Sequence, residues 1–205
     1  TKSGSTDWKA EVNTMIIPFT TDRVRLTSGY GSRTVDGKTG FHAGYDLVGI
    51  GSHIVTAAAP GKVAVSRIIT DKANRTWEWG NYVCVHGDDG RYYYYCHLAT
   101  RKVAKGEAVR AGDVLGVMGS TGYSFGAHLH FEVREADGRT TVNPEAVLNI
   151  PNREGIYAAP TSTLDADLAK LVAAKVINSP DYWRKTAPTV RYLPELLHNM
   201  AEVLK

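Results

Sequence analysis

The stretch Gly126–Val133 reads GAHLHFEV and carries two histidines, His128 and His130, separated by one residue. The alternation of polar and apolar residues that follows is typical of a β-strand. In a strand, residues i and i+2 point to the same face, so we expect the two imidazoles to project side by side. Adjacent imidazoles favour the neutral form, which is the commonest metal ligand in proteins. The doublet alone is also consistent with two ordinary strand histidines, so the metal hypothesis needs further ligands.

Candidate partners lie upstream, where His42 and Asp46 are four residues apart. Gly40 and Gly44 interrupt the pattern, so a turn leading into a strand is a better prediction than one face of a helix. Together with the downstream doublet, the pair makes a set of nitrogen and oxygen ligands. Three protein ligands with an open fourth position are typical of catalytic zinc. His97, at the end of the strand-like run 91–97, supplies another histidine.

The chain resembles the lysostaphin/LytM-type zinc endopeptidases through three motifs in the same order. These are His42-x-x-x-Asp46, Tyr95-x-His97-Leu98 and Gly126-x-His128-Leu129-His130-Phe131-Glu132. The resemblance covers roughly residues 15–148 and includes connecting pieces such as TSGYGSR at 27–33, APGKV at 59–63 and GSTGYS at 119–124. It implies that His42, Asp46 and His130 bind one Zn²⁺ per chain, and that His97 and His128 serve catalysis. Some family members carry an additional tyrosine on the loop before the first histidine, and residues 32–41 contain none here.

The function that this resemblance implies is zinc-dependent hydrolysis of peptide bonds in the stem peptides or cross-bridges of peptidoglycan. Zinc lowers the pKa of bound water to about 7, and the two further histidines then act as general base and electrostatic stabiliser. Segments 67–78 and 120–125 are the expected groove loops, and Trp77 and Trp79 are candidates either for the groove wall or for packing within a hairpin. Two alternatives are a catalytically silent wall-binding or hydrolase-activating module and a wall amidase. The intact set of five site residues argues against the silent module.

The fold class that we predict is mainly β, an antiparallel sheet domain with a small helical appendage at the C-terminus. Runs rich in Val, Ile, Tyr and Thr between Gly and Pro predict strands at 23–26, 40–48, 53–57, 61–69, 81–86, 91–97, 114–118, 128–134 and 141–143. In the run 92–95, four tyrosines alternate between the faces, which places Tyr93 and Tyr95 on the same face as His97. Most of these rings are expected to pack, and Tyr95 and Asn81 are the candidates for contact with substrate.

The predicted domain organisation has four parts: an N-terminal extension at 1–14, the peptidase domain at 15–148, a linker at 149–162 and a helical appendage at 163–205. The linker is predicted from Pro151, Gly155 and Pro160. Apolar residues at helical spacing predict two short helices after it, ended or begun by prolines. Such a small helical hairpin is marginal alone, so we expect it to pack on the peptidase or to target the wall.

The composition excludes some function classes. A net charge of +3 over 205 residues is only mildly basic, which argues against dedicated nucleic-acid binding. The sequence shows neither a signal peptide nor a run of about 18 apolar residues that could span a membrane. The resemblance, rather than the composition, implies an extracellular, wall-associated or phage-borne protein with peptidoglycan peptide as its partner, and we expect a monomer. Cys84 and Cys96 lie on neighbouring strands, and an unpaired buried state is favoured over a disulfide.

Overall fold

A computed structural model describes residues 16–35, 37–74 and 76–159 of the chain, together with 171, 175–179, 182–183, 197 and 200. The chain divides into two compact units, one made of residues 14–159 and the other of residues 1–13 with 160–205. The β-strands described below all belong to the first unit. The expected C-terminal helices lie largely outside the described residues. No helix in the described part of the chain has the length and apolar character needed to span a membrane.

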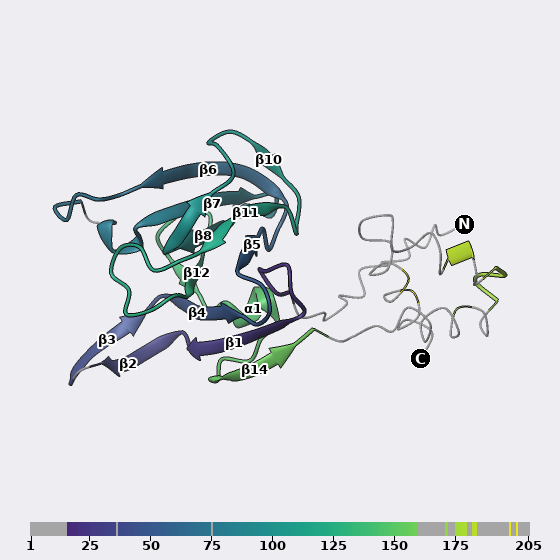
Figure 1. Cartoon of the computed structure of the whole chain (residues 1–205), viewed down its shortest axis with the longest axis horizontal. Coiled ribbons are helices and arrows are strands. Elements are labelled where there is room, and N and C mark those ends of the chain that lie inside the picture. Colours follow the sequence, from purple (N-terminus) through teal and green to yellow (C-terminus); the bar gives the residue numbers. More distant parts are fainter. Residues whose placement is uncertain are drawn as a thin grey trace, which may run out of the picture. The chain divides into compact units, whose positions relative to one another are not determined.

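The unit 14–159 is built from antiparallel strands in three sheets (Figure 1). The largest has nine strands in the order β10-β6-β7-β8-β12-β4-β1-β14, with β13 paired to β12; a second sheet has the order β5-β11-β9, and β2 pairs with β3 alone. The elements are β1 (Arg23–Ser28), β2 (Gly31–Val35), β3 (Lys38–His42), β4 (Gly44–Gly49), β5 (Ile54–Thr56), β6 (Gly61–Ile68), η1 (Trp77–Trp79), β7 (Asn81–Gly87), β8 (Tyr92–Cys96), β9 (Leu98–Arg101), β10 (Ala108–Val109), β11 (Val114–Met118), β12 (Leu129–Arg134), β13 (Thr141–Val142), α1 (Glu145–Leu148) and β14 (Gly155–Ala158). The mainly antiparallel β fold is therefore confirmed.

The main core takes its side chains from both larger sheets. Leu47, Tyr95 and Phe131 contribute from the nine-stranded sheet, and Val55 and Leu115 from the three-stranded sheet; all five are fully buried. A smaller cluster on the opposite face of β7 and β8 contains Tyr82, Cys84 and Cys96. The alternation of side chains along each strand sorts residues between the two. Both cysteines are buried and unpaired, as the sequence favoured.

Two segments differ from the sequence predictions. The segment before His42, expected to be a loop, forms the β2–β3 hairpin, in which Gly31 pairs with His42. The expected linker 149–162 belongs in part to the sheet, since β14 pairs with β1 and Ile150 is fully buried. Tyr45 also donates a hydrogen bond from its hydroxyl to the Ile150 carbonyl, at 3.0 Å. Pro and Gly in this segment therefore mark turns around an edge strand, where both residues are tolerated.

The pairing of β4 with β12 brings together the two motifs that lie furthest apart in the sequence. Asp46 is directly opposite His130 in this antiparallel register, and Gly44 is opposite Glu132. A Cβ atom on Gly44 would lie 2.3 Å from the Phe131 carbonyl oxygen, so only glycine permits this close approach of the strands. His42 ends β3, and Ala43 alone separates it from the start of β4, so its side chain comes to lie beside those of Asp46 and His130.

Candidate metal and catalytic site

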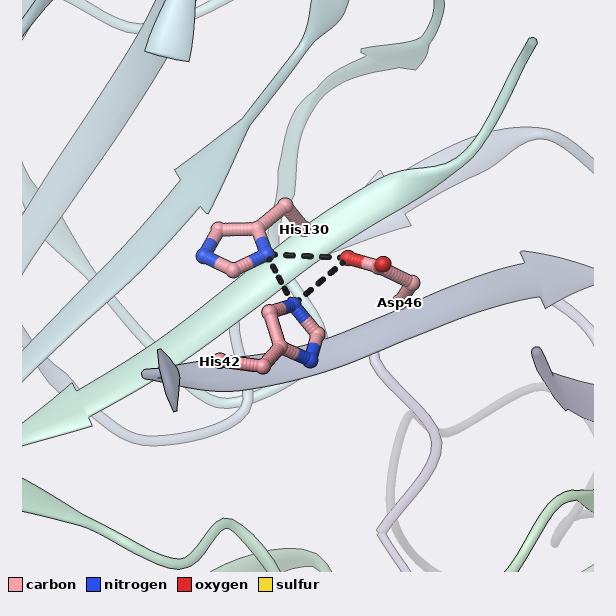
Figure 2. Close-up of side chains that lie close together, drawn as sticks. All are labelled: His42, Asp46 and His130. Carbon is pink, nitrogen blue, oxygen red and sulfur yellow. Dashed lines mark hydrogen bonds and ion pairs between the residues drawn. The ribbon is translucent and has the colours of Figure 1, made fainter. Parts of the chain in front are cut away.

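Three ligand-type side chains converge where β3, β4 and β12 meet (Figure 2). His42 Nε2 lies 3.1 Å from Asp46 Oδ1 and 3.0 Å from His130 Nδ1, and His130 Nδ1 lies 2.9 Å from Asp46 Oδ1. All three residues are buried, with no more than 9% of their surface exposed. The structure thus brings together the three residues that were predicted from the sequence to be metal ligands.

The outer hydrogen bonds of the two histidines determine which nitrogens face each other. His42 Nδ1 lies 2.7 Å from the Gly29 carbonyl, which can only accept, so this nitrogen carries the proton. His130 Nε2 lies 3.0 Å from Glu132 Oε1, which makes Nε2 the donor there. In the neutral tautomers, two nitrogen lone pairs and a carboxylate oxygen then converge on one point. Three electron-rich atoms at this separation repel one another unless a cation or a proton lies between them.

The ionisation of the cluster points the same way. Burial would raise the pKa of Asp46, but hydrogen bonds and charge interactions with His130 and His42 hold it well below its ordinary value. Burial would lower the pKa of His130, yet the hydrogen bonds that His130 donates to Asp46 and Glu132, together with their negative charges, outweigh burial and raise this pKa to about 9. In the metal-free protein a proton on His130 therefore supplies the positive charge that a bound metal ion would otherwise provide.

The donor set fits zinc in kind and in size. Tetrahedral zinc with nitrogen and oxygen ligands at about 2.0–2.1 Å has ligand–ligand separations of about 3.3 Å. The three separations here are 2.9, 3.0 and 3.1 Å, so a small outward movement accommodates the ion. Asp46 presents only Oδ1 to the cluster, because its Oδ2 lies 3.1 Å from the Arg33 guanidinium. One carboxylate oxygen and two imidazoles leave a fourth position for a non-protein ligand.

The two further histidines lie beside this cluster, with their rings 4.7 Å apart between centroids. His128 Nδ1 lies 2.8 Å from the Gly126 carbonyl, and His97 Nδ1 lies 2.8 Å from the Thr121 carbonyl. Both carbonyls accept, so in the neutral rings each Nε2 is left with its lone pair. His128 Nε2 lies 3.5 Å from Asp46 Oδ1, which places this lone pair next to the cluster.

His97 reaches the site through an unusual backbone conformation, with φ of 62°. The regular alternation of β8 ends at Cys96, and the left-handed turn at His97 moves its ring to the other face of the sheet. The prediction that Tyr95 and His97 share a face was therefore wrong. Tyr95 is fully buried in the main core, where its hydroxyl oxygen accepts a 2.7 Å hydrogen bond from the Ala58 backbone. It cannot contact a substrate.

Asn81 is also buried rather than exposed in the pocket. Its backbone N–H donates to Thr121 Oγ1 at 2.9 Å, and its side-chain amide donates to the Ala99 carbonyl at 3.3 Å. Since the Thr121 carbonyl accepts from His97, Asn81 secures the segment that orients a site histidine. The expected contact of Asn81 with substrate is not supported.

The cluster opens into a pocket between the predicted groove loops and the β2–β3 hairpin. Its lining includes His97, His128 and the three clustered residues, Arg33, Lys38 and Phe41 from the hairpin, and Glu78, Trp79, Tyr123 and Phe125 from the loops. Phe125 is 78% exposed and Phe41 is 61% exposed, so aromatic rings line both sides of the opening. Segment 120–125 lines the pocket with Tyr123, Ser124 and Phe125, whereas segment 67–78 reaches it only at its last residue, Glu78. Of the two candidate wall tryptophans, Trp79 lines the pocket and Trp77 does not.

No role was predicted from the sequence for Arg33, Glu132 or Arg134, although the first two lie in the family motifs. Glu132 and Arg134 follow His130 at spacings of two and four residues on β12, so strand alternation alone could have placed all three on one face. Arg33 had no comparable signal, because its approach to Asp46 depends on the β2–β3 hairpin.

We expect the low pKa of His97 to make the metal-free protein less stable in acid. Burial, followed by the charges of His130 and His128, lowers the pKa of His97 to about 4. The unfolded chain takes up this proton near pH 6.5, so the free energy of unfolding falls between pH 6.5 and 4, by on the order of 2 kcal/mol from this residue. Denaturant unfolding with a chelator at pH 7 and 4.5 measures the loss. The loss should be smaller in His97→Asn, because asparagine takes up no proton. Asparagine also tolerates the positive φ at this position, so the backbone is kept. An equal loss in both proteins contradicts the assignment.

An antiparallel β fold with a buried His-Asp-His cluster and two neighbouring histidines defines a metallohydrolase-like site. The sequence comparison then gives the family: the model for peptidase family M23 matches residues 40–144, about half of the chain, and the chain belongs to this family. DD-carboxypeptidase/endopeptidase Mpg of Neisseria meningitidis is 34% identical over 162 residues, which cover 76% of this chain and 35% of Mpg. Murein hydrolase activator NlpD of Escherichia coli is 31% identical over 108 residues, 53% of this chain and 27% of NlpD.

Solved structures agree with the family. The catalytic domain of lysostaphin from Staphylococcus simulans is 31% identical with a TM-score of 0.50, over 60% of this chain and 90% of that domain. A zinc-containing peptidase from Vibrio cholerae is 28% identical with a TM-score of 0.53, over 63% of this chain and 38% of that one. The chain spans only about a third of the length of Mpg and about a quarter of NlpD. The residues matched by the family model, 40–144, lie within the β unit that carries the site.

Proposed function

We propose that this protein is a zinc-dependent endopeptidase that cleaves peptide bonds in the stem peptides or cross-bridges of peptidoglycan. The observation that carries the proposal is the convergence of His42 Nε2, His130 Nδ1 and Asp46 Oδ1 within 3.1 Å of one another, at the base of an open pocket. Membership of family M23 and the names of Mpg and lysostaphin support the peptide bond as the bond cleaved, and the name of NlpD, a murein hydrolase activator, supports the wall as its source. The proposed place of action is outside the cytoplasm, at the wall or on a phage particle.

His42, Asp46 and His130 would hold the ion in this mechanism. Zinc bound by such residues polarises a peptide carbonyl and lowers the pKa of water. His97 and His128 each offer an unprotonated Nε2, so together they accept hydrogen bonds from both hydrogens of one attacking water. The imidazole that takes the proton becomes a donor and passes this proton to the leaving amine nitrogen. Until then neither ring can donate through Nε2, so stabilisation of a developing oxyanion by these rings follows proton transfer.

The groove suits an extended peptide with small side chains. It is open, and its walls combine aromatic rings with charged residues of both signs, Arg33 and Lys38 on one side and Glu78 on the other. Glycine bridges and D-alanyl stems present backbone and charged groups rather than large side chains. Such a substrate gains affinity from backbone contacts and from packing on exposed rings.

We expect Phe125→Ala to weaken substrate binding without changing the chemistry. The ring is 78% exposed beside the pocket, so its loss should raise KM by about fivefold and leave kcat and the free energy of unfolding unchanged. Ile156→Ala, at a 53% exposed apolar residue on β14, is the matched control and should leave KM unchanged. Equal KM values for Phe125→Ala and the parent protein exclude a binding role for this ring.

Mass spectrometry of purified peptidoglycan after digestion tests the proposed function directly. Walls with glycine bridges and walls with direct D-alanyl cross-links should both be tried, with a chelator-treated sample and a His128→Ala protein as controls. New peptide amino termini that are absent in both controls establish an endopeptidase and identify the bond. Release of terminal D-alanine alone indicates a carboxypeptidase, and cleavage between sugar and peptide indicates an amidase.

The similarity to NlpD keeps one second candidate in view, a silent module that activates another hydrolase. The complete set of His42, Asp46, His97, His128 and His130 supports the enzyme, because a silent module has no need for a converging ligand set. Absence of cleavage of every wall type by a zinc-loaded protein would favour the activator.

A further inference from the structure

His130 is held from both sides of its ring. Nδ1 faces His42 and Asp46, and the other ring nitrogen, Nε2, points away from the cluster (Figure 2). Nε2 lies 3.0 Å from Glu132 Oε1. Glu132 follows two residues later on β12, and the side chain is only 4% exposed. A buried carboxylate is costly unless its oxygens are paired, so its position beside a candidate ligand needs a physical reason.

Arg134 pairs with the other oxygen of Glu132. Its Nε and Nη2 donate to Oε2 at 2.9 and 2.7 Å, and its Nη1 donates to the Gly138 carbonyl at 3.2 Å. The guanidinium lies over the rings of Tyr94 and Trp79, 4.8 and 5.1 Å from their centroids. These contacts fix Glu132 so that Oε1 stays directed at His130.

A purely structural ion pair would need only Glu132 and Arg134. Instead, the two oxygens of Glu132 have different partners: Oε2 accepts from Arg134, and Oε1 accepts from His130. A carboxylate that accepts from Nε2–H fixes the tautomer in which Nδ1 carries the lone pair, and it makes this nitrogen a stronger electron donor. Outer partners of this kind typically change metal affinity by 10- to 100-fold.

We propose that Glu132 is a positioning residue of the metal centre and that it orients and polarises His130. Arg134, packed over the rings of Tyr94 and Trp79, holds Glu132 in place. This inference rests on the metal centre proposed above. It assigns to one face of β12 a continuous row of ligand, carboxylate and guanidinium at His130, Glu132 and Arg134.

Zinc affinity, measured on the full chain by competition with a fluorescent chelator, tests the proposal. Glu132→Ala should bind zinc about 10- to 100-fold more weakly than the parent. Glu132→Gln should fall between them, since its amide oxygen can still accept from His130 but carries no charge. The cobalt-substituted proteins should show a changed d–d absorption spectrum in both variants. Glu135→Gln is the matched control. Glu135 lies away from the cluster, and its Oε2 pairs with Arg91 Nε at a distance of 3.6 Å.

The outcomes separate this inference from the proposed function. Unchanged zinc affinity and an unchanged cobalt spectrum in Glu132→Gln, with the parent binding one zinc, overturn the positioning role and leave the metal centre intact. If Glu132→Ala fails to fold, the near-isosteric Glu132→Gln decides alone. A parent protein that binds no zinc overturns the metal centre and this inference with it.

Discussion

Asp46→Asn is expected to lose stoichiometric zinc and, with it, all measurable peptidase activity. Asp46 is the only carboxylate of the candidate ligand set, and its Oδ1 lies 2.9 Å from His130 Nδ1 and 3.1 Å from His42 Nε2. An uncharged amide removes the negative charge that offsets the ion, so zinc affinity should fall by more than 100-fold, a larger effect than that of an outer partner. Metal analysis after gel filtration and chelator competition measure the change.

The fold should survive the same substitution. The main core lies between the two larger sheets and does not include the ligand side chains, so chelator-treated Asp46→Asn and parent should keep the same secondary structure. Asp88→Asn, at an exposed residue in the β7–β8 turn, is the charge-matched control and should bind zinc normally. One zinc per chain in Asp46→Asn, with parental affinity, contradicts the assignment of this ligand.

Most of the strands could be predicted because their signals are local. Period-two alternation with Gly or Pro at the ends is a property of each segment, and every strand predicted from it is present, with 40–48 divided at Ala43 into β3 and β4. The candidate ligands could be predicted from the sequence for a related reason. His42 and Asp46 are only four residues apart, His130 lies in a regular strand, and the family motifs preserve the order of all three.

The wrong structural predictions have two causes, a single residue that breaks strand alternation and a strand pairing between segments far apart in the sequence. His97 adopts φ of 62°, so the alternation that correctly placed Tyr93 and Tyr95 on one face failed one residue after β8 ended. Similarly, β14 is an edge strand whose pairing with β1 spans more than 120 residues, and no local pattern in 149–158 reveals such a partner. Long-range pairing is set by the whole sheet rather than by the propensity of the segment.

The role of Glu132 shows that local information can be present and still go unused. His130, Glu132 and Arg134 satisfy strand alternation as plainly as the two histidines do, but a Glu-x-Arg pair on a strand is ordinarily a surface ion pair. Burial distinguishes the two cases: the side chains of Glu132 and Arg134 are 4% and 20% exposed. That quantity depends on how η1 brings Trp79 over Arg134, which the sequence of β12 does not encode.

His128→Gln is expected to lower kcat by about 10²- to 10⁴-fold while the protein keeps its zinc. The side chain lies outside the ligand set, and its free Nε2 is the candidate proton acceptor 3.5 Å from Asp46 Oδ1. Glutamine can hydrogen-bond to the Gly126 carbonyl but cannot carry the proton. Zinc affinity within about threefold of the parent, together with KM, separates a chemical role from loss of the metal.

His97→Asn should show the same division between activity and zinc affinity, and the double variant distinguishes a shared task from two separate ones. If both histidines act on one water, the loss in kcat for the double variant should be close to that of the worse single variant, because removing either one already disables the proton transfer. Losses that multiply instead indicate independent roles, with one histidine on the attacking water and the other on the leaving amine. The pairing of the two rings at 4.7 Å, both with Nδ1 held by a backbone carbonyl, favours the shared task.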